Sequence, residues 1–218
     1  MKRIIIRKLS CLLAGVLLMG ICYSQTDWSL KKDKDGIKVY TGKLPDSKFN
    51  AIKVSCKLNG SLSALTSILL QPELQLEWVI ATKTTKLVKR LAPNRIYYYT
   101  IASLPWPLVN RDLVIDLWIQ QDSLSKKVTI KANAIDHVLP NVKGLERVPF
   151  SQAIWEVTPI GSNSIQIDYY LRINPGGGVP AWLVNMFVIK GPFETFSNLS
   201  KLIQDKRFQG QHFDFIKN

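Results

Sequence analysis

The chain has 218 residues and a formal net charge of +13, and its length suits a single domain with a substantial core, so no second domain is needed. A basic surface suits nucleic acid, anionic lipid or solubility alone, and the export signal described next argues against nucleic acid. Two of the three cysteines, Cys11 and Cys22, belong to that signal, so Cys56 is expected to remain alone, which excludes an internal disulfide.

The N-terminus is typical of a secretory signal peptide. Four cations come first: Lys2, Arg3, Arg7 and Lys8. The apolar run Leu12–Ile21 that follows is about ten residues long, too short to cross roughly 30 Å of hydrocarbon, and Cys22 and Ser24 suit the cleavage positions. Cleavage after Ser24 removes 24 of the 218 residues and four cations without any acid, leaving 194 residues with a net charge of +9. We therefore expect a periplasmic or secreted protein of a Gram-negative bacterium.

Within the mature chain we expect one domain over residues 25–208 and a polar tail over 209–218. The first elements are two strands, Ile37–Gly42 and Asn50–Leu58, joined by a turn-rich segment. Ser61 is expected to cap a short helix, and Pro72 to open a second short turn that ends near Trp78.

From residue 82 to 172 the pattern predicts a meander of strands. The expected ranges are 82–91, 95–102, 111–120, 126–135, 150–158 and 164–172. Along Arg111–Gln120 one face is continuously apolar, formed by Leu113, Ile115, Leu117 and Ile119, while Asp112, Val114, Asp116 and Trp118 share the other. In Arg95–Ala102 both faces can be buried, so the alternation there does not decide which face is internal.

A long helix is predicted over Ala181–Gln204. The glycines 176–178 break regular structure before it, and Pro180 stands where a first helical turn tolerates proline. Residues 181–189 are apolar on nearly every side, which favours burial of this half against more than one neighbour. Gly191-Pro192 is expected to kink the helix, because proline lacks the amide donor.

Several motifs in this order resemble the steroidogenic-acute-regulatory-protein-related lipid-transfer family, the START domains. They are Asp35–Tyr40 (DGIKVY), Trp78, Pro105-Trp106-Pro107, Asn110-Arg111-Asp112 and Pro175–Asn185 (PGGGVPAWLVN). The resemblance covers about residues 28–203. It implies an α+β helix-grip fold related to Bet v 1, in which a curved antiparallel sheet of about seven to nine strands grips the C-terminal helix around a tunnel for one lipid-like molecule.

Under this resemblance the expected ligand is a lipid or another hydrophobic small molecule, and an anionic membrane surface is the further expected partner. The expected ligand-binding residues are Trp78, Tyr97, Tyr99, Trp106, Arg111, Asp112, Trp118, Val184, Phe187 and Val188. Two alternatives stay open at this point. Arg111 and Asp112 point to opposite faces, and each either orients a ligand head or forms a salt bridge at the start of its strand. Trp106 either anchors at a membrane interface or plugs one end of the core.

Catalytic motifs are not found. His137 and His212 are the only histidines, so a metal cluster is not expected, and no nucleophile elbow or phosphate-binding glycine loop occurs. We therefore expect no enzyme activity, no cofactor and no metal. The alternatives are a polyketide cyclase or aromatase of the same superfamily, against which export argues, and an interaction module with a filled core.

Overall fold

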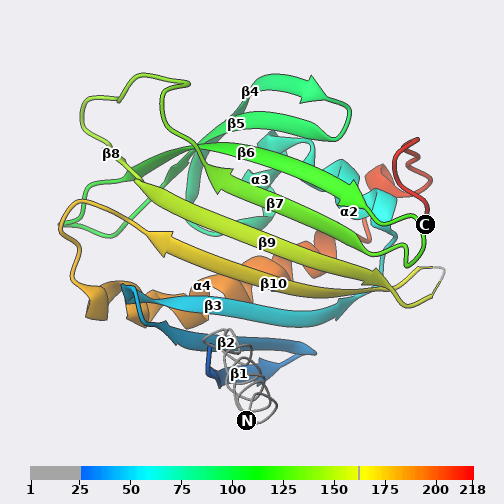
Figure 1. Cartoon of the computed structure of the whole chain (residues 1–218), viewed down its shortest axis with the longest axis horizontal. Helices are drawn as coiled ribbons and strands as arrows, with labels where there is room; N and C mark the ends of the chain where they lie inside the picture. The colour runs from blue at the N-terminus through cyan, green and yellow to red at the C-terminus, as the bar shows by residue number, and fades with distance from the viewer. Residues whose placement is uncertain (1–25, 162) are drawn as a thin grey trace, which may run out of the picture.

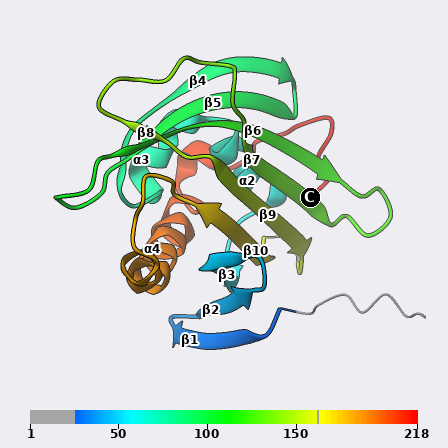
Figure 2. The same cartoon turned by 60° about the vertical axis from the view of Figure 1, so that its left-hand side comes forward.

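The computed structural model describes residues 26–218 apart from residue 162 and the side chains of residues 186 and 187. The predicted signal peptide therefore lies outside the described residues. One large sheet dominates the described part, with strand order β1-β2-β3-β10-β9-β7-β6-β5-β4 and the short β8 paired in parallel to β6. Figures 1 and 2 show that this sheet is curved and that α2, α3 and α4 lie against its inner side.

The ten strands are β1 (Trp28–Lys34), β2 (Ile37–Leu44), β3 (Ser47–Leu58), β4 (Thr82–Ala92), β5 (Arg95–Ala102), β6 (Arg111–Gln121), β7 (Val128–Ala134), β8 (Glu146–Arg147), β9 (Phe150–Pro159) and β10 (Ile165–Asn174). The helices are α2 (Leu62–Leu69), α3 (Gln75–Trp78) and α4 (Ala181–Leu202), with the 3₁₀ turns η1 (Pro72–Leu74) and η2 (Lys206–Phe208). The predicted curved antiparallel sheet, the two short helical segments and the long C-terminal helix are confirmed.

The long-range pairing of β3 with β10 joins the two halves of the sheet. β3 runs antiparallel to β10 with Leu58 opposite Ile165, although more than a hundred residues separate them. The other neighbours, apart from β7 with β9 and the short β8, follow one another along the chain as a meander. The sheet therefore consists of a hairpin with an added edge strand, β1–β3, fastened to the predicted six-strand meander.

Two strands of the sheet were not predicted from the sequence. β1 has the sequence WSLKKDK, and most of its side chains are exposed, so no apolar alternation marks it. It is held at the edge by antiparallel pairing with β2. β8 has only two residues, Glu146 and Arg147, too few to produce a period. Both strands depend on pairing rather than on burial.

Strand register identifies the inner face of the sheet. In β6 the residues Leu113, Ile115 and Leu117 point inward, and Tyr98 of β5 lies opposite Ile115 and shares this face. Tyr99, its neighbour along the strand, therefore points to the outer face. The alternation predicted for β6 is confirmed, and the register decides the question that β5 left open.

The short helices form as their capping residues predict. The Ser61 hydroxyl accepts a hydrogen bond from the Ala64 amide at 3.1 Å, and every residue of α2 is buried. Pro72 opens η1 at a position where its missing amide costs nothing. Among the described residues no helix combines the length and apolarity that crossing a membrane requires.

The last ten residues, predicted to be a polar tail, fold back onto the domain. Ile216 is 2% exposed, and the Asn218 side chain accepts a hydrogen bond from the Ser63 amide at 2.9 Å. Phe213 and Phe215 pack against each other with ring centroids 5.4 Å apart. The spacing Phe213-x-Phe215-Ile216 is the apolar signal that identifies this packing.

Cys56 lies within β3 and is buried, as expected for a small hydrophobic residue. Burial, with a smaller contribution from the negative charge of Asp168, raises the pKa of its thiol to about 12. The thiol is therefore protonated at neutral pH and is a poor nucleophile.

Candidate ligand-binding cavity

A cavity of about 330 Å³ lies between the inner face of the sheet and the helices α3 and α4, and it is partly open to the surface. Its sheet side is formed by inward-pointing residues of β5, β6, β7, β9 and β10. The aliphatic wall consists of Leu113, Ile115, Leu117, Leu171 and Ile173. The cavity is therefore lined mainly by apolar side chains, as ligand sites commonly are.

The cavity exists because small residues occupy the centre of the inner face. Ala132 of β7 lies directly opposite Ala153 of β9, and Ser151 and Ala102 continue this set of short side chains. On the helix side Gly191 faces the same space, and a Cβ built there would meet only Ile80, at 3.7 Å. Larger side chains at these positions would fill the volume.

An aromatic cluster closes the inner end of the cavity. Trp155 lies at its centre, with ring centroids 6.1 Å from Trp78, 4.9 Å from Tyr169 and 5.2 Å from Phe196. The contacts with Trp78 and Tyr169 are edge-to-face, the arrangement that the ring quadrupoles favour. These four rings join β9, β10, α3 and α4 and fix the depth of the cavity.

The polar groups in the cavity wall are neutral. Burial raises the pKa of Tyr98 to about 12, with a smaller opposing effect from its hydrogen bond with the Gln75 side chain. Burial also raises the pKa of Tyr169, helped by the neighbouring Tyr98. Both hydroxyls are therefore protonated at physiological pH. They offer hydrogen bonds to a ligand without offering charge.

Arg111 fastens the loops at one end of the cavity. Its guanidinium donates hydrogen bonds to the carbonyls of Val109, Pro175 at 3.3 Å and Gly176 at 3.5 Å, and only 4% of the residue is exposed. One side chain thus connects the segment before β6 with the glycine segment that precedes α4 (left side of Figure 1). The guanidinium contacts main-chain oxygens of the protein rather than the cavity.

Asp112 belongs to a separate cluster on the outer face. Arg147 donates two hydrogen bonds to its carboxylate, at 3.0 and 2.9 Å, and the Tyr99 hydroxyl donates a third at 3.1 Å. The hydrogen bond to Asp112 raises the pKa of Arg147, and burial, followed by the Asp112 charge, raises the pKa of Tyr99 to about 12. The salt bridge at the start of the strand, one of the two alternatives for Asp112, is therefore present.

The ten residues predicted to bind a ligand do not form one group. Trp78 lines the cavity. Four others, Tyr97, Tyr99, Asp112 and Trp118, lie on the outer face of β5 and β6, because they alternate with the inward residues. The sequence does not show on which side of the strands the helices pack, so it could not distinguish these residues from their inward-pointing neighbours.

The remaining predicted residues lie around the cavity. Trp106 is 92% exposed on its loop, so it does not plug the core. Val188 is buried in the core and Val184 is packed against it, but neither borders the cavity. The side chain of Phe187 lies outside the described part of the chain. The residues that the sequence analysis missed are chiefly Tyr98, Trp155 and Tyr169, which are identified as internal only by the side of the sheet on which α3 and α4 pack.

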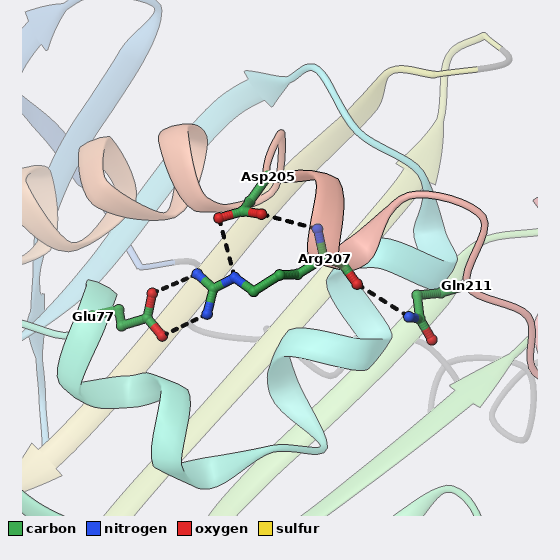
Figure 3. Close-up of polar contacts among 4 residues, drawn as sticks. All are labelled: Glu77, Asp205, Arg207 and Gln211. Carbon is green, nitrogen blue, oxygen red and sulfur yellow. Dashed lines mark hydrogen bonds and ion pairs between the residues drawn. The ribbon is translucent and has the colours of Figure 1, made fainter.

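The C-terminal end of α4 is tied to α3 by ion pairs. Figure 3 shows Arg207 between Glu77, at 3.1 and 2.7 Å, and Asp205, at 3.1 Å, while Gln211 donates to the Arg207 carbonyl at 3.2 Å. The hydrogen bonds from Arg207 lower the pKa of Glu77 and of Asp205. This network connects η2, which follows α4, to α3, one of the elements that line the cavity.

No acid–base pair or metal-ligand cluster accompanies the cavity within the described residues. No group of three His, Cys, Asp or Glu side chains there is placed to hold a metal ion. The titratable groups of the wall are tyrosines. The arrangement offers an apolar volume with a few neutral hydrogen-bonding groups.

A curved antiparallel sheet with a long C-terminal helix against its inner side is the helix-grip architecture that the sequence resemblance implies. The START domain family matches residues 12–207 of this chain, so the chain belongs to that family.

The similar proteins include bacterial and mammalian members. A STAR-related lipid transfer protein from Xanthomonas axonopodis has a crystal structure that superposes with a TM-score of 0.76 at 28% identity, covering 82% of this chain and 99% of that one. An uncharacterized protein of Pseudomonas aeruginosa is 29% identical over 79% of this chain and 85% of its own length. Phosphatidylcholine transfer protein of Mus musculus is 24% identical over 82% of this chain and 85% of its own.

Proposed function

We propose that this protein binds a lipid or other hydrophobic small molecule in the cavity and carries it outside the cytoplasm. The observation that carries the proposal is the apolar volume of about 330 Å³ enclosed by Ala132, Ala153 and Gly191 in a START domain. Similarity to proteins named as lipid-transfer and phosphatidylcholine-transfer proteins supports it.

The energetics favour carriage through such a volume. Moving a chain of about 16 carbons from a bilayer into water costs on the order of 0.8 kcal/mol per methylene, or roughly 13 kcal/mol in all. A cavity lined by Leu, Ile and aromatic side chains replaces the bilayer interior with a similar medium. Binding is then nearly balanced, so the ligand also leaves again.

The location outside the cytoplasm is proposed from residues 1–24, with their basic start and short apolar run. Mass spectrometry of the protein exported by the native cell tests it. A mature N-terminus at Gln25 supports export, and recovery of the full chain from the cytoplasm contradicts it.

An anionic membrane surface is the proposed docking partner. Trp106 and Trp182 are 92% and 68% exposed, and Arg111 connects the loop of Trp106 to the segment that precedes α4, the helix that carries Trp182. Exposed indoles favour the bilayer interface, and a basic chain favours anionic headgroups. Replacing both tryptophans with Ala should abolish co-sedimentation with phosphatidylglycerol vesicles, whereas Trp118→Ala, on the outer face, should leave it intact. Equal vesicle binding by the unsubstituted protein, the double variant and Trp118→Ala would contradict the proposed docking site.

The test of carriage is mass spectrometry of organic extracts from the natively purified protein, repeated after the cavity has been filled. A stoichiometric lipid supports carriage, a small aromatic molecule favours a cyclase, and no ligand favours a filled core.

Ala153→Phe places a ring in the cavity and should reduce lipid loading at least about tenfold, because a close-packed interior has no other space for the ligand. Ile154→Phe adds a ring to the same strand on the outer face and is the matched control. Gly191→Leu fills the cavity from α4 without disturbing the sheet, which keeps the test valid if Ala153→Phe does not fold. Full loading of both filled variants would contradict the site.

A further inference from the structure

The cavity wall contains no ionised group. Of the described residues that line it, those whose side chains carry a polar group are Gln75, Trp78, Thr82, Tyr98, Thr100, Ser151, Tyr169 and Thr195. No Asp, Glu, Lys, Arg or His side chain is among the lining residues. The buried Arg111, at the start of β6, has its hydrogen bonds directed to main-chain carbonyls. A charged ligand group inside the cavity would therefore have no counter-ion there.

Several of these neutral groups already have partners. The Thr195 hydroxyl accepts a hydrogen bond from the Ile80 amide at 3.3 Å, and the Thr100 hydroxyl donates to the Thr84 carbonyl at 3.3 Å. Tyr98 is hydrogen-bonded to the Gln75 side chain. Two lining groups at the aromatic end have no hydrogen-bond partner among the described residues: the buried indole nitrogen of Trp78 and the Tyr169 hydroxyl. Of the two, only the Tyr169 hydroxyl can both donate to and accept from a polar atom of the ligand.

The size of the cavity restricts the ligand further. At about 330 Å³ it lies at the lower end of the range of roughly 300–1,000 Å³ found for ligand pockets. Ala132 and Ala153 provide the width, whereas the rings of Trp155 and Phe196 limit the depth. A diacyl phospholipid brings two chains and an ionised headgroup; the volume is small for two chains, and the lining offers the headgroup no counter-ion.

We infer that the ligand is an uncharged single-chain lipid with a hydroxyl or ester group, such as a monoacylglycerol or a fatty alcohol, whose polar atom pairs with the Tyr169 hydroxyl. This inference rests on the proposed function and narrows its ligand class. An unpaired ion is strongly disfavoured in an apolar site, so an ionisable lipid enters in its neutral form. A fatty acid should accordingly load as the protonated acid.

The test incubates the mature protein separately with 1-monopalmitoylglycerol, hexadecanol, palmitate and phosphatidylcholine vesicles, and counts bound lipid by mass spectrometry after gel filtration. We expect one monopalmitoylglycerol or hexadecanol per protein and less than about a tenth as much phosphatidylcholine. Palmitate loading should be at least about tenfold greater at pH 5 than at pH 8, because desolvation raises the pKa of the bound acid. Equal loading of phosphatidylcholine, or of palmitate at the two pH values, would overturn the inference while leaving lipid carriage intact.

Tyr169→Phe removes the hydroxyl but keeps the aromatic ring, so it tests the hydrogen bond apart from the apolar contacts. Loss of one hydrogen bond should weaken monopalmitoylglycerol and hexadecanol binding by about fivefold and leave hexadecane binding unchanged. Tyr170→Phe, on the opposite face of the same strand, is the matched control. Unchanged binding of all ligands to Tyr169→Phe would remove Tyr169 from the site. If none of the lipids binds the unsubstituted protein, the carriage proposal itself fails.

Discussion

The two halves of α4 are held in the domain by very different means. Beyond Pro192 the helix is deeply buried: Phe196 is 1% exposed, Leu199 is fully buried, and Ile203 follows with no exposure. Arg207 then ties the end of the helix to Glu77 of α3. Apolar packing and an ion-pair network thus act together on the C-terminal half.

The N-terminal half has fewer attachments. It starts after three consecutive glycines with positive φ, and Pro180 provides no side-chain cap. Trp182 is 68% exposed, and among the described side chains one polar contact, from the Asn50 amide to the Asn185 carboxamide at 3.2 Å, connects this half to β3. Val188 is buried in the core, and Val184 and Ile189 pack against it while only partly buried. The difference teaches that one helix is firmly packed at its C-terminal end and more weakly attached at its N-terminal end.

The largest expected effect is the difference in stability between two Leu→Ala variants, one in each half of α4. Leu199→Ala should lower the free energy of unfolding by about 2–5 kcal/mol, because it leaves a cavity in a fully packed site. Leu183→Ala, at a half-buried position, should lower it by about 1 kcal/mol or less. Chemical denaturation followed by tryptophan fluorescence measures both. Equal losses would show that the two halves are equally well packed.

Substitutions of the two glycines before α4 should have effects of intermediate size on stability. Both Gly177 and Gly178 have left-handed φ values, of 59° and 65°. A Cβ on Gly177 would lie 2.8 Å from the Arg111 guanidinium, whereas a Cβ on Gly178 would meet nothing within 4 Å.

Gly178→Ala should therefore cost only the backbone strain, about 1–2 kcal/mol, and Gly177→Ala should cost more and release the Arg111 contacts. Amide hydrogen exchange should then increase in residues 181–190 for Gly177→Ala and change less for Gly178→Ala. The same exchange pattern in both variants would show that the Arg111 contacts do not hold residues 181–190 in place.

The smallest effect concerns the ion pairs of the C-terminal end. Because Arg207 lowers the pKa of Glu77 and Asp205, these carboxylates stabilise the fold at pH values above their ordinary pKa, near 4, and lose that contribution as the pH falls through the lower folded values. Glu77→Gln should lower Tm slightly at pH 6, and the difference should vanish near pH 3 and in 1 M salt. A difference that persists at low pH would mean that the network acts by packing rather than by charge.

The sequence predicted the fold more fully than the site. Turn residues and apolar alternation located the six-strand meander, and Ser61 and Pro72 marked the short helices. β1 was missed because edge pairing needs no apolar pattern. Residues 209–218 were predicted to be a polar tail because most of their side chains are charged or polar, and the short apolar group Phe213, Phe215 and Ile216 was given no weight.

The site depended on information that a single strand does not contain. Tyr97, Tyr98 and Tyr99 are chemically equivalent in the sequence, and only the side on which α3 and α4 pack decides that Tyr98 is internal. The cavity itself is created by the absence of bulk at Ala132 and Ala153, whose pairing across β7 and β9 appears only once the strands are in register. Composition draws attention to large side chains, whereas this site is made by small ones.

The two open borders of the ten-stranded sheet bear on how this protein avoids self-association. Unpaired strand edges invite cross-molecule β-pairing and aggregation, and lysine is a common protection against it. β1 carries three lysines in seven residues, and β4, at the far border, carries four cations and no acid in eleven. Much of the excess positive charge thus lies where two copies would otherwise join, so neutralising these borders should favour fibrils or oligomers even if ligand carriage is unaffected.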